Sequence, residues 1–270
     1  MQVRVRGIDF TSRPKRSKPI TLAECELSDG KLTFLRLQAL ASFSDFEAAL
    51  EEPGHWIAGI DFPFGQSRKF VENIGWPLDW IEYVKVVERM GRSDFREQLE
   101  SYRRDRLAGD KEHRRRTDSA AGSISPQKLY GVPVGLMFFE GAPRIAASTA
   151  TIPGLKAGDP DHVVVESYPG VLARSLVGRR GYKTDTKSKQ SPAHHSARQD
   201  ILESLRSRGF AEQYGFAVEA PPELADDPSG DELDALLVRY RQHGLGQNAT
   251  RTSGCRRSST LSKVGYLTPI

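Results

Sequence analysis

The sequence predicts an α/β fold, with a mixed five-stranded sheet flanked by helices and interrupted by a largely helical insertion. The tetrapeptide Gly-Ile-Asp-Phe occurs at 7–10 and again at 59–62, each time closing a short run of strand-forming residues. Ser28-Asp29-Gly30 is a strong hairpin signal between two further strand-like runs. A length of 270 residues with 38% apolar content is typical of one large domain.

The first part of the chain alternates strand and helix signals in a definite order. The expected elements are strands at 2–9, 20–27 and 31–39, a helix at 43–52, and a strand at 55–61. Ser42 or Ser44 is expected to cap the helix, and Pro53-Gly54 to end it. Three antiparallel strands, a helix and a strand parallel to the first fit a ribonuclease H-like fold, and other mixed sheets also satisfy this order.

The remaining elements follow a break at 62–142, which we interpret as an insertion that packs on the core and does not fold alone. It is expected to be helical at 78–107 and then loop-rich and basic. A short strand is expected at 143–148, and His-Val-Val-Val-Glu at 162–166 predicts a central, buried strand. Capping-box patterns predict helices at 196–208, with Ser196 as cap, and from Ser229 onward.

Acidic residues recur at the ends of these elements. The set comprises Asp9, Asp61, Glu166, Asp231 and Asp234. A carboxylate at the end of a buried strand is costly unless it is paired or binds a metal. Hard cations such as Mg²⁺ or Mn²⁺ take oxygen ligands, and a metal pair can activate water for phosphoryl displacement. We therefore predict a metal site, in which all five acids are candidate ligands and catalytic residues.

Each acid also has a structural interpretation. Asp231 lies in the first turn of a helix, where the helix dipole favours any acid. Asp9 could start a turn, Asp61 could cap the following segment, and Glu166 could pair with a basic residue of 179–189. The metal hypothesis therefore depends on the acids converging in space.

Basic residues give a second set of candidates. The net charge is +4, which permits a nucleic-acid partner without requiring one. Lys183, Lys187 and Arg116 are the candidate phosphate-binding residues, and the alternatives are a solvated helix face or a surface loop.

The sequence disfavours membrane proteins, secreted proteins and disulfide-rich proteins. No apolar run reaches membrane-spanning length, so no membrane association is expected. The charged N-terminus is unlike a signal peptide, and two cysteines are too few for a disulfide framework, so a cytoplasmic location is expected. Oligomeric state leaves no signal in the sequence.

Beyond these patterns, the chain resembles the family of predicted ribonuclease H-like nucleases named domain of unknown function 429. The resemblance covers roughly residues 1–240 and depends on short motifs in a fixed order. These are Gly-Ile-Asp-Phe, Gly-Ile-Asp-Phe-Pro-Phe-Gly, Arg-Arg-Arg-Thr-Asp (114–118), Tyr-Gly-Val-Pro-Val-Gly-Leu-Met (130–137), Glu-Ser-Tyr-Pro-Gly (166–170), Gly-Tyr-Lys (181–183) and Asp-Glu-Leu-Asp-Ala-Leu (231–236).

The resemblance implies a core similar to that of Holliday-junction resolvases, with Asp9, Asp61, Glu166 and Asp231 or Asp234 as metal ligands. We expect a single domain at 1–243, and the resemblance also leads us to expect an Ala-rich helix after Leu237. The chain instead becomes polar there and rich in Ser and Arg, so 244–270 is expected to be a disordered tail.

Three functions follow from these observations. The favoured one is a metal-dependent nuclease. A non-catalytic nucleic-acid or protein-binding module on the same fold is the main alternative. An actin-like ATPase or sugar kinase is the third, and it would need a second domain and a second Gly-rich phosphate loop that the sequence lacks.

Overall fold

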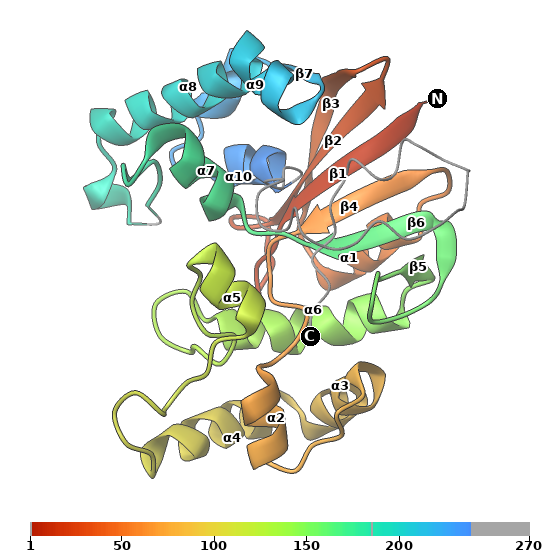
Figure 1. Ribbon diagram of the computed structural model, residues 1–270, viewed down its shortest axis with the longest axis vertical. Coiled ribbons are helices and arrows are strands. Elements are labelled where there is room, and N and C mark those ends of the chain that lie inside the picture. Colours follow the sequence, from red (N-terminus) through yellow and green to blue (C-terminus); the bar gives the residue numbers. More distant parts are fainter. Residues whose placement is uncertain (1, 185, 239–270) are drawn as a thin grey trace, which may run out of the picture.

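A computed structural model describes residues 2–184 and 186–238 (Figure 1). These residues form an α/β structure around a mixed, seven-stranded sheet with the order β5-β6-β4-β1-β2-β3-β7. The strands are β1 (Val3–Asp9), β2 (Ile20–Ser28), β3 (Lys31–Leu40), β4 (Trp56–Ile60), β5 (Ala150–Thr151), β6 (Asp159–Glu166) and β7 (Ala217–Glu219).

The strand directions agree with the sequence prediction. β1, β2 and β3 form an antiparallel meander, β4 lies parallel to β1 on its other side, and β6 lies parallel to β4. The predicted count of five strands was wrong, because β5 and β7 add a parallel strand at each edge. These strands have two and three residues, which is too short for an alternating pattern to be recognised in the sequence.

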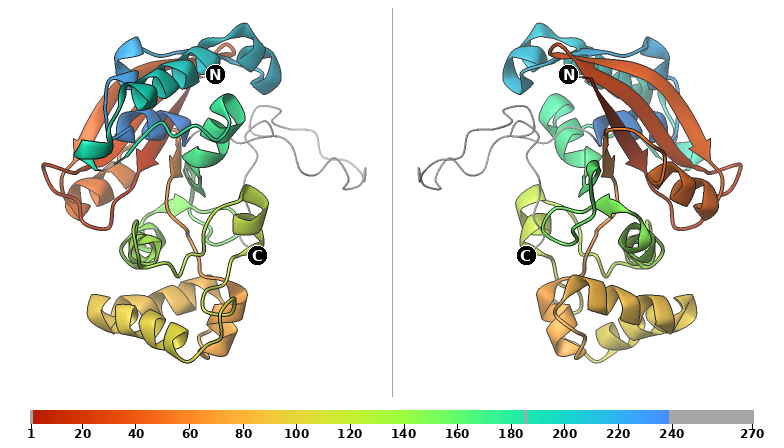
Figure 2. Two further views of the ribbon diagram at one scale, coloured as in Figure 1. Left: turned by 90° about the vertical axis from the view of Figure 1, so that its left-hand side faces the viewer. Right: turned by 90° about the vertical axis from the view of Figure 1, so that its right-hand side faces the viewer.

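Helices cover both faces of the sheet (Figure 2). They are α1 (Phe43–Leu50), α2 (Arg68–Asn73), α3 (Trp80–Met90), α4 (Arg92–Arg104), α5 (Arg116–Ala121), α6 (Val134–Ala147), α7 (Pro169–Val177), α8 (Pro192–Arg206), α9 (Arg208–Tyr214) and α10 (Asp231–Leu237). Two 3₁₀ turns, η1 (Lys187–Lys189) and η2 (Pro222–Ala225), connect them. α7 to α10 lie on one face, α1 and α6 lie on the other, and α2 to α4 lie beyond α6.

Three boundary predictions need correction. The strand expected at 143–148 lies mostly inside α6, whose buried Phe138, Ala142 and Ile145 follow the helical period despite Pro143. α8 begins at Pro192, because proline is well suited to the first turn of a helix, so Ser196 lies inside the helix. In α10 the cap position is taken by Gly230, while the Ser229 hydroxyl bonds to Asp227 instead.

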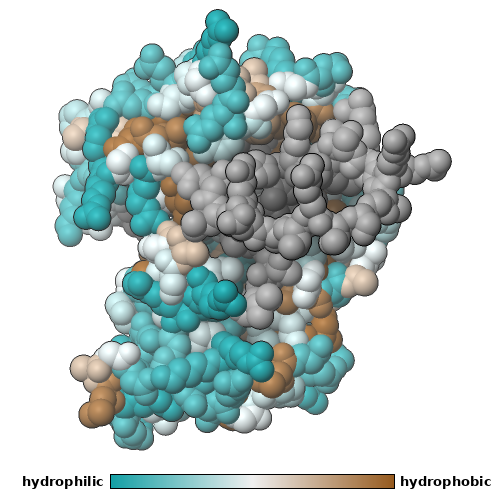
Figure 3. Space-filling model, viewed as in Figure 1, coloured by the Kyte–Doolittle hydropathy of each residue, from teal (hydrophilic) through white to brown (hydrophobic). Residues whose placement is uncertain are grey.

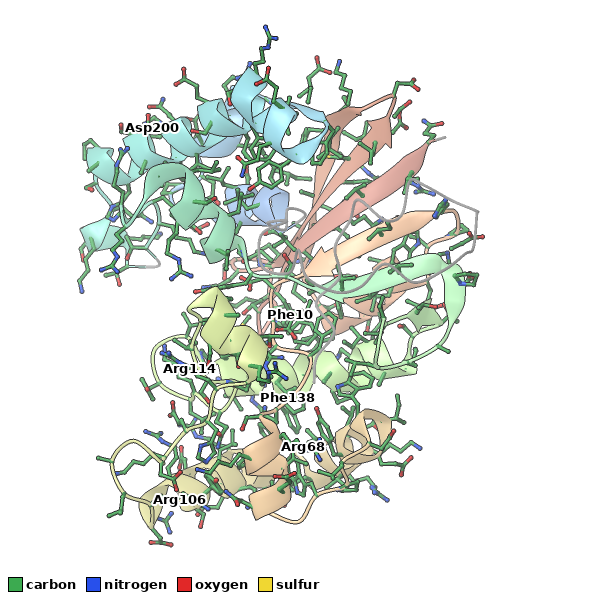
Figure 4. All side chains as sticks on the ribbon, viewed as in Figure 1. Phe10, Arg68, Arg106, Arg114, Phe138 and Asp200 are labelled. Carbon is green, nitrogen blue, oxygen red and sulfur yellow. The ribbon has the colours of Figure 1, made fainter. Side chains whose placement is uncertain are left out.

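Each face of the sheet has its own hydrophobic core. Ile8, Ile60 and Phe10 belong to the first core, where Phe138 of α6 also lies (Figure 4). The insertion contributes Phe70, Val84 and Phe95 to this same core. It therefore packs on the rest of the domain, as predicted. The second core joins α7 to α10 with the opposite face, through residues such as Leu172, Ile201, Leu233 and Leu236.

The two copies of Gly-Ile-Asp-Phe lie side by side. Gly7 pairs with Gly59 and Ile8 pairs with Ile60 across the parallel β1–β4 ladder. Since side chains alternate along a strand, the isoleucines enter the first core and the glycines face α10. A Cβ atom on Gly59 would lie 2.7 Å from the carbonyl oxygen of Val238, which directly follows α10. The glycine therefore allows α10 to approach the sheet closely.

Within residues 2–184 and 186–238, no helix combines the length and the hydrophobicity needed to cross a bilayer. The predicted disordered tail at 244–270 lies outside the described residues, as does the end of the predicted domain at 243.

The close approach at Gly59 gives a first prediction. We expect Gly59→Ala to destabilise the protein by about 1–3 kcal/mol, because the added methyl group would push α10 away from β4. Chemical denaturation measures this. Gly209→Ala is the matched control: its nearest atom, Ser207 Oγ, is 3.9 Å away, and a helical alanine is expected to be neutral or stabilising. Equal midpoints for wild type and Gly59→Ala would contradict the prediction.

A candidate acidic site at the ends of two parallel strands

Asp9 and Asp61 lie together at the carboxyl ends of β1 and β4. Asp9 is the last residue of β1, and Asp61 directly follows β4, with its backbone N–H donating to the carbonyl of Ile8 at 3.0 Å. The predicted adjacency of the two strands is confirmed. Within the described parts of the chain, neither carboxylate accepts a hydrogen bond. Figure 1 shows this end of the sheet turned toward α10 and the start of α7.

Two more acids come from α10, which packs on β1. Asp231 is partly buried in the first turn of the helix, and Asp234 is fully buried one turn later. Asp234 already has two partners. One oxygen accepts a hydrogen bond from the Tyr182 hydroxyl at 2.6 Å, and the other contacts the Lys183 ammonium group. The Gly-Tyr-Lys segment is therefore attached to α10 through Asp234.

Burial, with a smaller contribution from neighbouring acids, shifts the pKa values of these carboxyl groups. Burial raises the pKa of Asp9 well above its usual range; Lys183 opposes this shift, and Asp234 adds to it. Burial also raises the pKa of Asp61 to about 7, with Asp234 contributing. The pKa of Asp231 is raised by burial and lowered in part by Lys183 and Lys18. The ionised form of these buried carboxyl groups is therefore disfavoured, although Lys183 opposes the shift at each of them.

Lys183 keeps its charge in these surroundings. Burial acts against its ammonium group, but Asp234 and Asp9 hold the pKa of Lys183 well above its ordinary value. The chain approaches α10 closely at this point, since a Cβ atom on Gly230 would lie 2.8 Å from Cβ of Lys183.

Glu166 has a different environment from the two aspartates. It pairs with Ile60 on β4, so alternation directs its side chain toward the first core rather than toward α10. Both of its oxygens are bound by Arg115, at 2.7 and 2.5 Å, and one also accepts from the backbone N–H of Phe64 at 2.8 Å. Glu166 is near enough to act on the pKa of Asp61, but its own charge is balanced.

Arg115 was missed by the sequence analysis, which chose Arg116. The Arg115 guanidinium is buried and bridges Glu166 and Asp118, and these acids hold its pKa above the ordinary value despite burial. Arg116 and Arg114 on either side are exposed, and Figure 4 labels Arg114 beside α5. The spacing of Arg115 and Asp118 was the available signal, but an i, i+3 pair in a basic run is too common to select one arginine.

Of the other predicted phosphate-binding residues, Lys183 lies in the site and Lys187 is exposed in η1. A hollow of about 440 Å³ lies between α1 and α6, lined by residues such as Glu47 and Arg144, and none of the five acids lines it. The candidate site is therefore defined by its charges and not by this hollow.

The donor set fits a hard divalent cation in chemistry and in charge. Asp9, Asp61 and Asp231 offer carboxylate oxygens, which Mg²⁺ and Mn²⁺ prefer, and burial with repulsion from neighbouring acids raises their pKa values, which a bound cation would counteract. The ligand geometry is not preformed: among the described residues, no three His, Cys, Asp or Glu side chains are arranged to hold a metal ion.

Comparison with known proteins adds no assignment. No family model matches the chain, and neither a curated protein nor a solved structure is significantly similar to it. The resemblance to the domain of unknown function 429 family therefore stays a prediction.

The raised pKa of Asp61 predicts how stability depends on pH. The folded pKa of about 7 lies above the unfolded value of 3.8, so the folded state binds the proton more tightly. Stability contributed by this group is lost as pH rises from about 4 to about 7. Asp61→Asn should remove that loss and stabilise the protein by roughly 1–3 kcal/mol at pH 8, after allowance for solvent screening, with little gain at pH 4.

Thermal unfolding in EDTA between pH 4 and pH 8 measures this difference. Asp200→Asn is the control, because Asp200 lies on the surface of α8, where it pairs with Arg180. If the difference in Tm between Asp61→Asn and wild type does not grow with pH, the charge of Asp61 does not destabilise the protein.

Lys183 and Lys187 allow a matched comparison within one segment. Lys183→Gln should destabilise the protein by about 1–3 kcal/mol, because it leaves the fully buried Asp234 without its cation. Lys187→Gln should change the unfolding free energy by less than about 0.5 kcal/mol, since Lys187 is exposed. Urea denaturation at pH 7 measures both, and equal effects would rule out the structural role of Lys183.

Proposed function

We propose that this protein is a metal-dependent nuclease that hydrolyses phosphodiester bonds in nucleic acid with Mg²⁺ or Mn²⁺. The observation that carries the proposal is a pair of carboxylates, Asp9 and Asp61, at the ends of adjacent parallel strands, which accept no hydrogen bond from residues 2–184 and 186–238. The strand order β3-β2-β1-β4-β6, with β2 antiparallel to its neighbours, also supports a ribonuclease H-like core.

In this proposal Asp9 and Asp61 would hold the metal, and Asp231 would complete the site from α10. A bound divalent cation would supply activation of water and neutralisation of charge on the phosphate. Lys183 remains protonated beside Asp234, so its ammonium group can bind a non-bridging phosphate oxygen.

The two remaining predicted ligands have a different role in this structure. Glu166 already binds Arg115 and Asp234 already binds Lys183, so a metal at either carboxylate would compete with these cations. We therefore assign Glu166 and Asp234 to positioning: they fix Arg115 and Lys183 at the border of the site.

One observation favours the second candidate, a non-catalytic binding module. Glu166 and Asp234 are already neutralised by side chains of the chain, as expected of structural acids. Such a module would bind nucleic acid without a divalent cation, and its affinity would fall with salt concentration.

The nuclease proposal predicts that Asp9→Asn lowers cleavage at least about 100-fold, because the amide loses the charge that holds the metal. The assay is a panel of single-stranded, duplex, hybrid and branched nucleic acids with Mg²⁺, Mn²⁺ or EDTA. Thermal unfolding gives a second readout: Mn²⁺ should raise the Tm of the wild type and not that of Asp9→Asn.

Asp200→Asn serves again as the surface control, with unchanged cleavage expected. Cleavage that survives in Asp9→Asn would refute the proposal. The binding module would be favoured if the wild type binds nucleic acid in a salt-sensitive way without cleaving it and its Tm does not change with Mn²⁺.

A further inference from the structure

A partly exposed aromatic ring lies beside the acidic site. Tyr168 follows β6 and occupies the N-cap position of α7, and 37% of its surface is exposed. Burial raises the pKa of Tyr168, Arg174 opposes the shift and Asp61 adds to it, so these charges lie close to the hydroxyl. Asp234 and Lys183 act on it as well. The backbone places the ring there too, because the N–H of Ser167, just before Tyr168, donates to the carbonyl oxygen of Ile60 at 3.0 Å, next to Asp61.

Other residues hold the ring in place. A Cβ atom on Gly170 would lie 3.2 Å from Cζ of Tyr168, so the phenol end rests against the first turn of α7. The guanidinium carbon of Arg174 is 5.8 Å from the ring centroid. Arg174 is itself fixed by the carbonyl oxygens of Gly170, Ala121 and Gly122, at 3.0, 2.8 and 3.4 Å. These contacts support the ring from the side of α7.

These contacts also link Arg174 of α7 to Ala121 and Gly122 at the end of α5. The space-filling view shows an indentation at the left of the molecule, between the α7–α8 part above and the α5 part below (Figure 3). The Arg174 contacts join these two parts, so Tyr168 lies where the core and the insertion meet.

Tyr130, a more exposed tyrosine, differs from Tyr168. Its hydroxyl bonds to Glu112, and both Arg103 and Lys128 lie over its ring, so the insertion accounts for its position. No hydrogen bond to the Tyr168 hydroxyl is present in the described residues.

We propose that Tyr168 is a stacking platform for an unpaired nucleobase of the substrate, next to the acidic site of Asp9 and Asp61. This inference rests on the proposed nuclease function and narrows its substrate class to single-stranded or frayed nucleic acid. Aromatic rings stack on any base, and Arg174 beneath the ring adds positive charge near the backbone. Within a duplex both faces of a base are already stacked, so only an unpaired base can use the ring.

Binding of a labelled single-stranded oligonucleotide containing 2-aminopurine tests this, in EDTA and in Ca²⁺. Tyr168→Phe keeps the ring and should bind within about twofold of wild type. Tyr168→Leu keeps bulk without aromaticity and should bind about 5–100-fold more weakly, the range expected for losing one stacked base. Quenching of 2-aminopurine should persist in Tyr168→Phe and disappear in Tyr168→Leu. Duplex binding should be the same in all three proteins.

Cleavage kinetics give a second readout, in which Tyr168→Leu should raise KM for the single strand and leave kcat nearly unchanged. Unchanged single-strand affinity in a folded Tyr168→Leu would overturn the stacking role, while Asp9-dependent cleavage would still support the nuclease. Equal losses in Tyr168→Phe and Tyr168→Leu would also overturn it, because the hydroxyl would then be the important group. A wild type that neither binds nor cleaves any member of the panel would overturn both proposals.

Discussion

The parallel pairing of β1 and β4 is the constraint on which the candidate site depends. With Gly7 opposite Gly59, Asp9 and Asp61 must leave the sheet side by side, and α10 can pack closely over them. Burial of two charges at such a position opposes folding, and repulsion from Asp234 adds to this cost, which raises the pKa values of both aspartates. Strain of this kind is typical of functional sites, where stability is given up for a local property.

Within the described residues, some acids of the candidate site are paired with basic side chains and others are not. Glu166 is matched by Arg115, and Asp234 by Tyr182 and Lys183. Both pairs also attach a loop segment to the core, which is a sufficient structural reason for them. Asp9 and Asp61 attach nothing through their side chains in the described structure. This contrast separates the acids that stabilise the site from those that are free to act.

Sequence reasoning found the acid pair because a repeated tetrapeptide marks two equivalent strand ends. It could not place Glu166, because the face on which a strand residue points depends on register with β4, and register is a tertiary property. Arg115 was hidden among three consecutive arginines of equal local character. The strands β5 and β7 were missed because they are too short to show a period.

The unpaired aspartates can be accommodated in two ways, and these exclude each other. With a pKa of about 7, Asp61 can take up a proton near neutrality and lower the charge of the cluster. A divalent cation instead requires both carboxylates to be ionised, so metal binding and proton release are linked. Lys183 compensates the charge of Asp9 only in part, because its ammonium group also contacts Asp234 and the pKa of Asp9 stays raised. A chain that needed only structural acids could pair Asp9 and Asp61 as it pairs Glu166, and their open carboxylates are therefore the strongest reason to expect a bound cation.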